Sequence, residues 1–222
     1  MKVAFIIDPI HRLDAGHDTS VALMEAAQAA GHEVWITQAE WLGVETGKAM
    51  ARLQPVTLKP VTLGDDRWVA VPDWYSLGEQ VYQPLETMDV VMMRTDPPVT
   101  IPYLYTTYVL DYVDPARTLV MNSPQGLRAA NEKMYALQFT EAIPETIVSG
   151  DKAVILETVE RWGRAVLKPL GGKDGEGILF LEKGDRNLNS MIEISTLRGQ
   201  EPVMVQTYLH EAKDGGKRFI LL

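Results

Sequence analysis

A lysine followed by a cluster of glycines is the segment of this chain best suited to chemistry. Lys168 and Pro169 lead into residues 170–177, which read LGGKDGEG. Glycines let backbone N–H groups turn inward and approach an anion closely, and a lysine at the end of a strand adds a fixed positive charge beside that anion. The segment therefore predicts a phosphate-binding loop, with a plain flexible hairpin as the alternative. Its glycines are Gly171, Gly172, Gly175 and Gly177.

The loop matches neither of the two common phosphate-binding motifs. A Walker A sequence ends in Gly-Lys-Ser or Gly-Lys-Thr, and a dinucleotide fingerprint follows its first strand with glycines. Here the first apolar run, residues 2–7, leads into Asp8 and Pro9 instead. The loop is therefore interpreted as a phosphate site between two strands of a hairpin.

Two further segments have side chains that suit a nucleotide. Lys133 lies near an expected helix start, where a cation opposes the helix dipole unless it meets an anion. The alternative for Lys133 is a solvated helix lysine. Residues 206–209 (QTYL) end an expected strand, whose backbone groups and Gln206 side chain could contact a purine edge. Such a string is otherwise an ordinary strand end.

A third set of polar residues follows the expected strands of the first half. Asp8 ends the first strand, and Arg94 and Asp96 come at the end of the apolar run 89–94. Open α/β sheets bind ligands at the carboxyl ends of their strands, and an arginine pairs with a carboxylate in bidentate fashion. These residues are candidates for substrate binding. The alternative is that Arg94 and Asp96 only pair with each other.

The elements that must position these residues fall into two groups. In the first half, apolar runs at 2–7, 33–37, 89–94 and 118–121 predict buried parallel strands. A helix should begin after Asp18 and end at Gly31. A second helix should place its apolar and tyrosine side chains between Ile101 and Tyr112 on one buried face. Short β segments between 43 and 83 suggest hairpins at the sheet edge.

The second half predicts a compact α+β unit with the order β-α-β-β-α-β. A helix is expected over 131–139 before this unit, and a new strand over 217–222 after it. The six expected elements are a strand at 145–148, a helix around 153–159, strands at 165–169 and 178–181, a helix at 190–197 and a strand at 203–208.

Composition excludes several classes of protein. The 222 residues carry a net charge of −9, which argues against a nucleic-acid binder that acts through bulk charge. No apolar run approaches the roughly 20 residues of a membrane-spanning helix. The chain has no cysteine, which excludes disulfides and a thiolate nucleophile, and its four histidines show no ligand spacing.

The polar segments, taken in order, resemble the bacterial glutathione synthetases of the ATP-grasp superfamily. The resemblance runs along essentially the whole chain, and its most specific strings are residues 94–98 and residues 122–133. The matching strings are IDP at 7–9, MRTDPP at 93–98, NSPQGLR at 122–128, NEK at 131–133, LKPLGG at 167–172, QTYL at 206–209 and KDGGKR at 213–218.

This resemblance implies a fold and an activity. The fold would be α/β, with a Rossmann-like pre-ATP-grasp domain (1–125), an α+β ATP-grasp lid domain (126–202) and the beginning of a C-terminal ATP-grasp subdomain (203–222). The activity would be that of a cytoplasmic ligase that joins γ-glutamylcysteine to glycine with ATP, through an acyl phosphate. The chain would be truncated, with the ligands for Mg²⁺ or Mn²⁺ in the missing C-terminal part. We also expect a homo-oligomer with no nucleic-acid or membrane partner.

The resemblance also implies roles for individual residues. Lys133 and Lys168 would contact ATP phosphates, and the loop of Gly171, Gly172, Gly175 and Gly177 would close over them. Arg218 would bind the phosphate and substrate end of the site as the catalytic candidate. The adenine pocket would be formed by Gln206, Tyr208 and Leu209, and γ-glutamylcysteine would be bound by Asp8, Arg94 and Asp96.

Two departures from the family pattern concern the loop and the ribose contact. The family loop usually has a Met-Gly-Gly core where this chain has KDGEG at 173–177, and Gly216 stands where an acidic residue is frequent. Two alternatives stay open at this point. One is a non-catalytic nucleotide- or ligand-binding fragment, and the other is an ATP-grasp carboxylate–amine ligase with different substrates.

Overall fold

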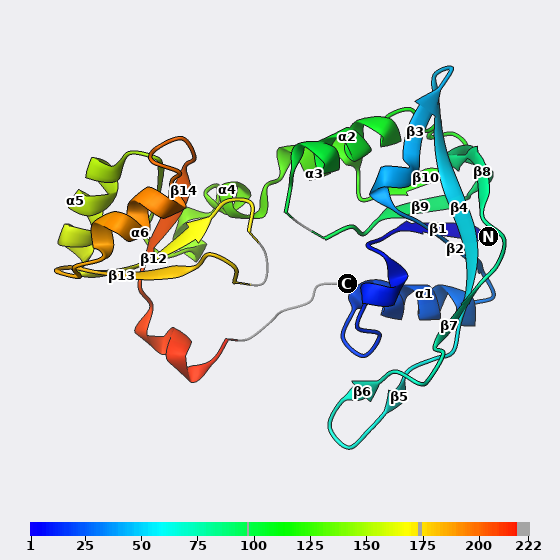
Figure 1. Cartoon of the computed structure of the whole chain (residues 1–222), viewed down its shortest axis with the longest axis horizontal. Coiled ribbons are helices and arrows are strands. Elements are labelled where there is room, and N and C mark those ends of the chain that lie inside the picture. Colours follow the sequence, from blue (N-terminus) through cyan, green and yellow to red (C-terminus); the bar gives the residue numbers. More distant parts are fainter. Residues whose placement is uncertain (97, 173–174, 217–222) are drawn as a thin grey trace. The chain divides into compact units, whose positions relative to one another are not determined.

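The chain forms two compact units, Met1–Ala129 and Ala130–Leu222, in the computed structural model (Figure 1). The structure describes residues 1–96, 98–172 and 175–216. Each unit has its own sheet and its own hydrophobic core.

The first unit is built on four parallel strands in the order β10-β9-β1-β2. The central strand β1 is buried on both faces, as its continuous apolar run predicts. Helix α1 packs its Val21 and Met24 on one face, and α2 packs Leu110 on the other (Figure 1). The bounds are Lys2–Ile6 for β1, Thr19–Ala29 for α1, Glu33–Thr37 for β2, Val90–Met93 for β9, Ile101–Leu110 for α2 and Leu119–Met121 for β10.

An antiparallel extension lengthens this sheet beyond β2. Its main strand, β4 (Lys48–Leu58), pairs with β2, β3, β7 and β8. Only short β segments were expected here, whereas β4 is a continuous strand of 11 residues. It follows β3 through a tight hairpin turn at Thr46 and Gly47, which both have positive φ. The other bounds are Leu42–Glu45 for β3, Thr62–Leu63 for β5, Trp68–Val69 for β6, Tyr75–Leu77 for β7 and Val81–Pro84 for β8.

The prediction that the apolar and tyrosine face of α2 is buried is wrong. Tyr105 is 64% exposed, and the helix buries Thr106, Thr107 and Leu110 instead. Threonine can be buried here because both hydroxyls donate to carbonyls of their own helix, those of Pro102 and Leu104. The tyrosine-rich face of α2 is therefore exposed within its unit.

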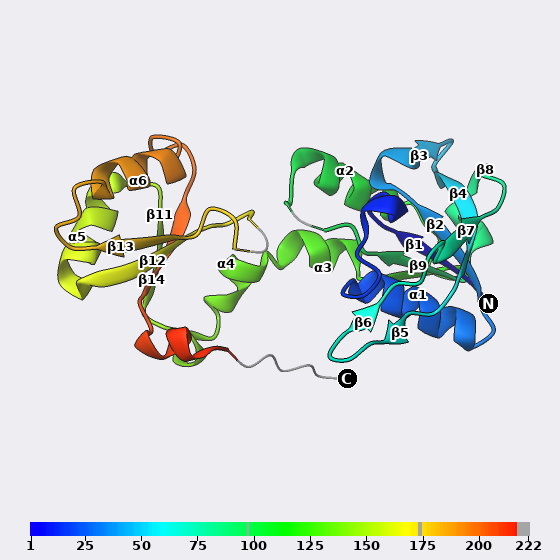
Figure 2. The ribbon, with the colours of Figure 1, turned by 60° about the horizontal axis from the view of Figure 1, so that its bottom comes forward.

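The second unit has a four-stranded antiparallel sheet in the order β11-β14-β12-β13, and its β-α-β-β-α-β order is as predicted. Helices α5 and α6 cover one face of this sheet (Figure 2). The bounds are Glu132–Ala136 for α4, Thr146–Ser149 for β11, Lys152–Trp162 for α5, Arg164–Pro169 for β12, Leu179–Glu182 for β13, Leu188–Ser195 for α6 and Val203–Thr207 for β14.

Strand β14 lies between β11 and β12 in this sheet. The predicted order of elements included this strand in the α+β unit, whereas the family resemblance implied a domain boundary at residue 203. In the structure Val203 and Val205 complete the core under α5 and α6. Met204 and Gln206 alternate with them and face the side of the sheet that these two helices leave open.

Two helix predictions before this sheet differ from the structure. A short helix, α3 (Pro124–Ala129), was not expected, and α4 ends three residues earlier than predicted. The expected strand at 217–222 lies outside the described residues. Short 3-10 helices lie at Ile10–Arg12, Ala39–Trp41, Leu85–Thr87, Thr140–Ala142 and His210–Asp214.

Candidate functional site

A cavity of about 400 Å³ lies on the open face of the second sheet. Two lysines and a glutamine give it a polar end, and the glycine loop forms part of its rim. The lining residues are Glu132, Lys133, Ala136, Ile143, Pro144, Lys168, Pro169, Gly172, Gly175, Glu176, Ile178, Met204 and Gln206.

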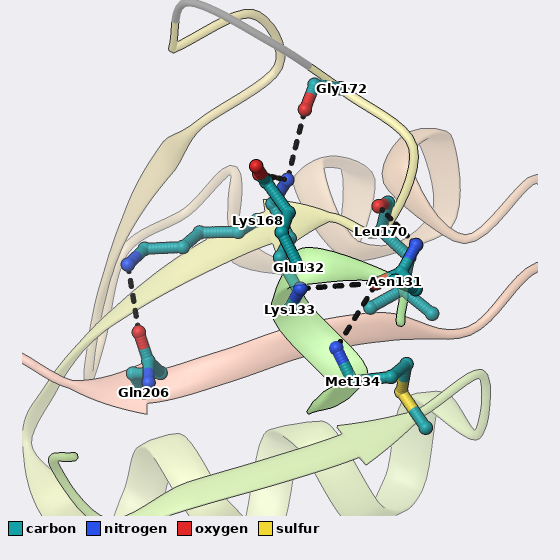
Figure 3. A network of polar contacts seen from close by, with 8 residues as sticks. All are labelled: Asn131, Glu132, Lys133, Met134, Lys168, Leu170, Gly172 and Gln206. Atoms are coloured by element: carbon teal, nitrogen blue, oxygen red, sulfur yellow. Dashed lines mark hydrogen bonds and ion pairs between the residues drawn. The ribbon is translucent and has the colours of Figure 1, made fainter. Parts of the chain in front are cut away.

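Lys168 lies near the end of β12 and extends across the sheet to β14 (Figure 3). Its Nζ donates a hydrogen bond of 2.7 Å to Gln206 Oε1. Burial lowers the pKa of Lys168, and the positive charge of Lys133 lowers it further. The ammonium is therefore held in place by a neutral oxygen in a site where its charge is unfavourable.

Lys133 lies in the first turn of α4, which is capped by Asn131. The Asn131 Oδ1 accepts from the backbone N–H groups of Lys133 (3.1 Å) and Met134 (3.0 Å). The Lys133 Nζ donates to Gly172 O at 2.9 Å and to Glu132 Oε1 at 2.8 Å. The helix start thus directs a second ammonium toward the glycine loop (Figure 3).

The glycine loop needs glycine most strictly at position 177. Gly177 has a φ of +69°, and a Cβ there would lie 2.7 Å from Pro169 Cγ. Gly175 also has a positive φ, of +81°. The near side of the loop is tethered to α4, because Asn131 Nδ2 donates to Leu170 O at 3.2 Å. Both the backbone and the α4 contacts therefore hold the loop over the cavity.

An apolar wall also lines this cavity, and it was not predicted from the sequence. It consists of Ala136, Ile143, Pro144, Ile178 and Met204. The period-two pattern of β14 could have identified Met204, since this side chain must share a face with Gln206. A cavity lined by apolar side chains and by two cations suits a ligand that has both a flat ring and anionic groups.

Not every predicted adenine contact lines this cavity. The centroid of the Tyr208 ring lies 5.8 Å from that of Phe180 and 5.1 Å from that of His210, and Tyr208 lines a smaller hollow of about 290 Å³. Leu209 is 50% exposed. Arg218, predicted as catalytic, lies outside the described residues. The structure thus brings together Lys133, Lys168, Gln206 and the glycine loop.

The predicted substrate residues lie at the carboxyl ends of β1 and β9. The chain leaves β1 toward β2 and leaves β9 toward β10 on the other side, so this is the switch point of the sheet, where such folds bind ligands. Asp8 Oδ2 accepts from the backbone N–H of Asp96 at 3.3 Å, and Arg94 Nε donates to Ser20 Oγ at 3.2 Å. The two carboxylates and the arginine therefore lie at one edge of the sheet.

A second cavity, of about 420 Å³, opens beside Asp96. Thr95, Thr100 and Tyr103 line it together with residues of the 39–42 segment. Burial raises the pKa of Tyr103, so its hydroxyl stays protonated. This cavity places hydroxyl groups and the carboxylates of Glu40 and Asp96 beside apolar side chains such as Leu42 and Val109.

Neither a cluster of metal-binding side chains nor a membrane-spanning helix occurs in the part of the chain that the structure describes. Within 1–96, 98–172 and 175–216, no three His, Asp or Glu side chains group closely enough to hold a metal ion. No helix in those same ranges combines the length and the apolar character needed to cross a membrane.

The fold and the cavity define the class of protein. The structure is similar to an ATP-grasp RimK domain protein from Sphaerobacter thermophilus (TM-score 0.56, 19% identity, covering 94% of this chain and 64% of that one). It is also similar to D-cycloserine synthetase DcsG (TM-score 0.57, 13% identity, covering 96% and 61%). The chain has the ATP-grasp fold, and the predicted α/β class is confirmed.

Sequence comparison gives the family within that class. The family described as "Prokaryotic glutathione synthetase, N-terminal domain" matches residues 1–128, and its "ATP-grasp domain" matches 132–222. A protein named glutathione synthetase from Nostoc sp. is 68% identical over the whole chain, which spans 68% of that relative. The protein named glutathione synthetase from Pseudomonas aeruginosa is 35% identical to this chain, which spans 67% of its length. The chain belongs to the prokaryotic glutathione synthetase family, as its resemblance predicted.

Proposed function

We propose that the chain binds ATP and γ-glutamylcysteine for the synthesis of glutathione. In this reaction ATP phosphorylates the γ-glutamylcysteine carboxylate, and the amine of glycine then displaces phosphate from the acyl phosphate. The products are glutathione, ADP and phosphate. The observation that carries the proposal is the pair Lys133 and Lys168 at the polar end of the cavity, in a chain that is 68% identical to a named glutathione synthetase.

The two lysines would bind the phosphates of ATP, and the apolar wall would bind its base. Phosphoryl transfer depends mainly on positioning and on neutralising the charge of the transferred group. Lys133 and Lys168 project into one cavity and supply two such charges. Closure of the glycine loop over the phosphates would exclude water, which otherwise hydrolyses an acyl phosphate.

The switch point of the first unit would bind γ-glutamylcysteine. Arg94 is suited to a substrate carboxylate, because a guanidinium pairs with a carboxylate through two hydrogen bonds. Asp8 and Asp96 are suited to the substrate's ammonium group. Together these residues would distinguish a zwitterionic dipeptide from a simple carboxylic acid.

A divalent ion would accompany ATP and neutralise charge on its phosphates. Glutamate and aspartate oxygens are its usual ligands. The cavity residues fit the nucleotide, but among those that the structure describes only Glu132 and Glu176 are carboxylates, and Glu132 already pairs with Lys133. We therefore assign no metal ligand among the described residues.

Nucleotide binding is the first test of this function. Calorimetry should show that the chain binds ATP and that Lys168→Met weakens this binding at least tenfold, since a charged hydrogen bond contributes about 1.5–3 kcal/mol. Lys152→Met is the control, because Lys152 pairs with Glu193 away from this cavity. Equal ATP affinity of the Lys168 variant and the unaltered chain would contradict the assignment of the site.

Catalysis is tested by ADP release with γ-glutamylcysteine, glycine and Mg·ATP. We expect the 222 residues by themselves not to ligate, because they span 68% of the Nostoc relative and the rest of that protein has no counterpart in them. A protein that continues with a relative's C-terminal third should be active. Turnover with an unrelated acid but not with γ-glutamylcysteine would instead favour another ATP-grasp ligase.

A further inference from the structure

Thr146 has a defined polar role on the open face of the second sheet. It lies on β11 directly opposite Gln206 of β14. Its hydroxyl donates a 2.7 Å hydrogen bond to Pro144 O, and its Oγ1 lies 2.9 Å from Gln206 Nε2. A hydroxyl has one proton. Because Pro144 O receives that proton, Thr146 can only accept a hydrogen bond from Gln206.

This contact fixes the orientation of the Gln206 carboxamide. The amide nitrogen must face Thr146, and therefore the amide oxygen faces Lys168 Nζ at 2.7 Å. A flipped amide would place its N–H groups against the lysine ammonium and its oxygen against the lone pairs of Thr146. Gln206 is only 8% exposed, so water cannot readily compensate for either loss.

We propose that Thr146 is a positioning residue of the nucleotide site, which acts through Gln206 to hold the Lys168 ammonium in the cavity. This inference rests on the proposed ATP-binding role of Lys168. A neutral oxygen suits the task, since it orients the ammonium without cancelling its charge. A carboxylate in its place would pair with the lysine and repel phosphate.

The other charged groups of the cavity do not replace this support. Lys133 and Glu132 come from α4, and Glu176 comes from the glycine loop. Lys133 is directed to Gly172 O and Glu132, and its positive charge opposes that of Lys168. The chain of hydrogen bonds from Pro144 through Thr146 and Gln206 is therefore an independent support for Lys168.

Two variants of Thr146 test the proposal. Thr146→Val keeps the size of the side chain and removes the hydroxyl, whereas Thr146→Ser keeps the hydroxyl. We expect Thr146→Val to weaken ATP binding about three- to tenfold, the effect of losing one buried hydrogen bond, and Thr146→Ser to stay within about twofold. Thr158→Val is the matched control, because this buried threonine on α5 bonds only to Val154 O among the described contacts.

A second measurement does not depend on nucleotide. The titration of Lys168, followed by NMR of labelled lysine side chains in the free protein, should move to lower pH in Thr146→Val, because Gln206 Oε1 is then no longer held toward the charged ammonium. Thr146→Ser should restore it. An unchanged titration in Thr146→Val, or the same shift in Thr158→Val, would overturn the proposal. Failure of the unaltered chain to bind ATP would refute the nucleotide site and leave this comparison valid.

A double variant covers the case in which a change at Thr146 disturbs folding. Gln206→Met removes the carboxamide through which Thr146 is proposed to act. Adding Thr146→Val to this background should change neither ATP affinity nor the Lys168 titration any further. An additional effect equal to that in the unaltered background would show that Thr146 does not act through Gln206, which overturns the proposal.

Discussion

Asn131 joins α4 to the glycine loop, and its replacement gives the sharpest test of how the loop is held. Its Oδ1 caps α4 through the N–H groups of Lys133 and Met134, while its Nδ2 donates to Leu170 O at 3.2 Å. Asn131→Ala removes the cap and the tether together. Asn131→Ser keeps a capping oxygen, since serine caps helices as well as asparagine does, but is too short to reach Leu170.

The two variants should therefore separate two contributions. Loss of the cap costs about 1 kcal/mol, and loss of the tether costs about 1 kcal/mol. Each corresponds to an approximately fivefold increase in the population that opens locally. We expect Asn131→Ala to raise amide exchange rates about fivefold in both α4 and residues 168–172, and Asn131→Ser to raise them only in 168–172.

Hydrogen–deuterium exchange of the free protein measures both segments in one experiment. Asp151→Ala is the matched control, because Asp151 caps α5 through Ala153 and Val154 and is not tethered to the loop. It should raise exchange at the start of α5 alone. The reasoning would be refuted if Asn131→Ser left residues 168–172 as protected as in the unaltered chain, since the tether would then contribute nothing.

Three further predictions concern charge, backbone and substrate. The folded chain releases the Lys168 proton at lower pH than an unfolded chain, so the free energy of unfolding should rise as pH increases from the lowered pKa to the ordinary lysine value. ATP affinity should fall over the same pH range, because the ammonium is lost. Both pH dependences should disappear in Lys168→Met, the first in denaturant titrations and the second in calorimetry. Gly177→Ala should destabilise the second unit more than Gly184→Ala in urea unfolding, because both glycines have positive φ but only the former would bring a Cβ to 2.7 Å from Pro169. Arg94→Lys should weaken γ-glutamylcysteine binding and leave ATP affinity unchanged in calorimetry, and equal losses for both ligands would contradict the assignment of Arg94 to the substrate.

The strands were the most predictable part of the fold. Buried parallel strands such as β1 and β9 are continuous apolar runs, and their ends are marked by Asp8 and Arg94. Helix α1 was equally clear, since Asp18 accepts from two backbone N–H groups at its start. These signals are local in sequence, and for that reason the parallel strands and the polar residues at their ends could be predicted.

Other features depend on contacts that are distant in sequence. The buried face of α2 could not be predicted from apolar periodicity, because Thr106 and Thr107 satisfy their hydroxyls within the helix and are buried, whereas Tyr105 and Tyr108 are exposed. The role of Thr146 was missed for a related reason. It lies 60 residues from Gln206, and only the pairing of β11 with β14 brings the two together.

The cavity also explains how a chain with a net charge of −9 can serve an anionic ligand. What matters is the local field, and here Lys133 and Lys168 face one cavity closely enough for the former to lower the pKa of the latter. Two like charges in a partly buried site are unfavourable until an anion lies between them. A polyphosphate would relieve that repulsion and a neutral molecule would not, so in the proposed function this electrostatic cost would make the site selective for the phosphate end of a nucleotide.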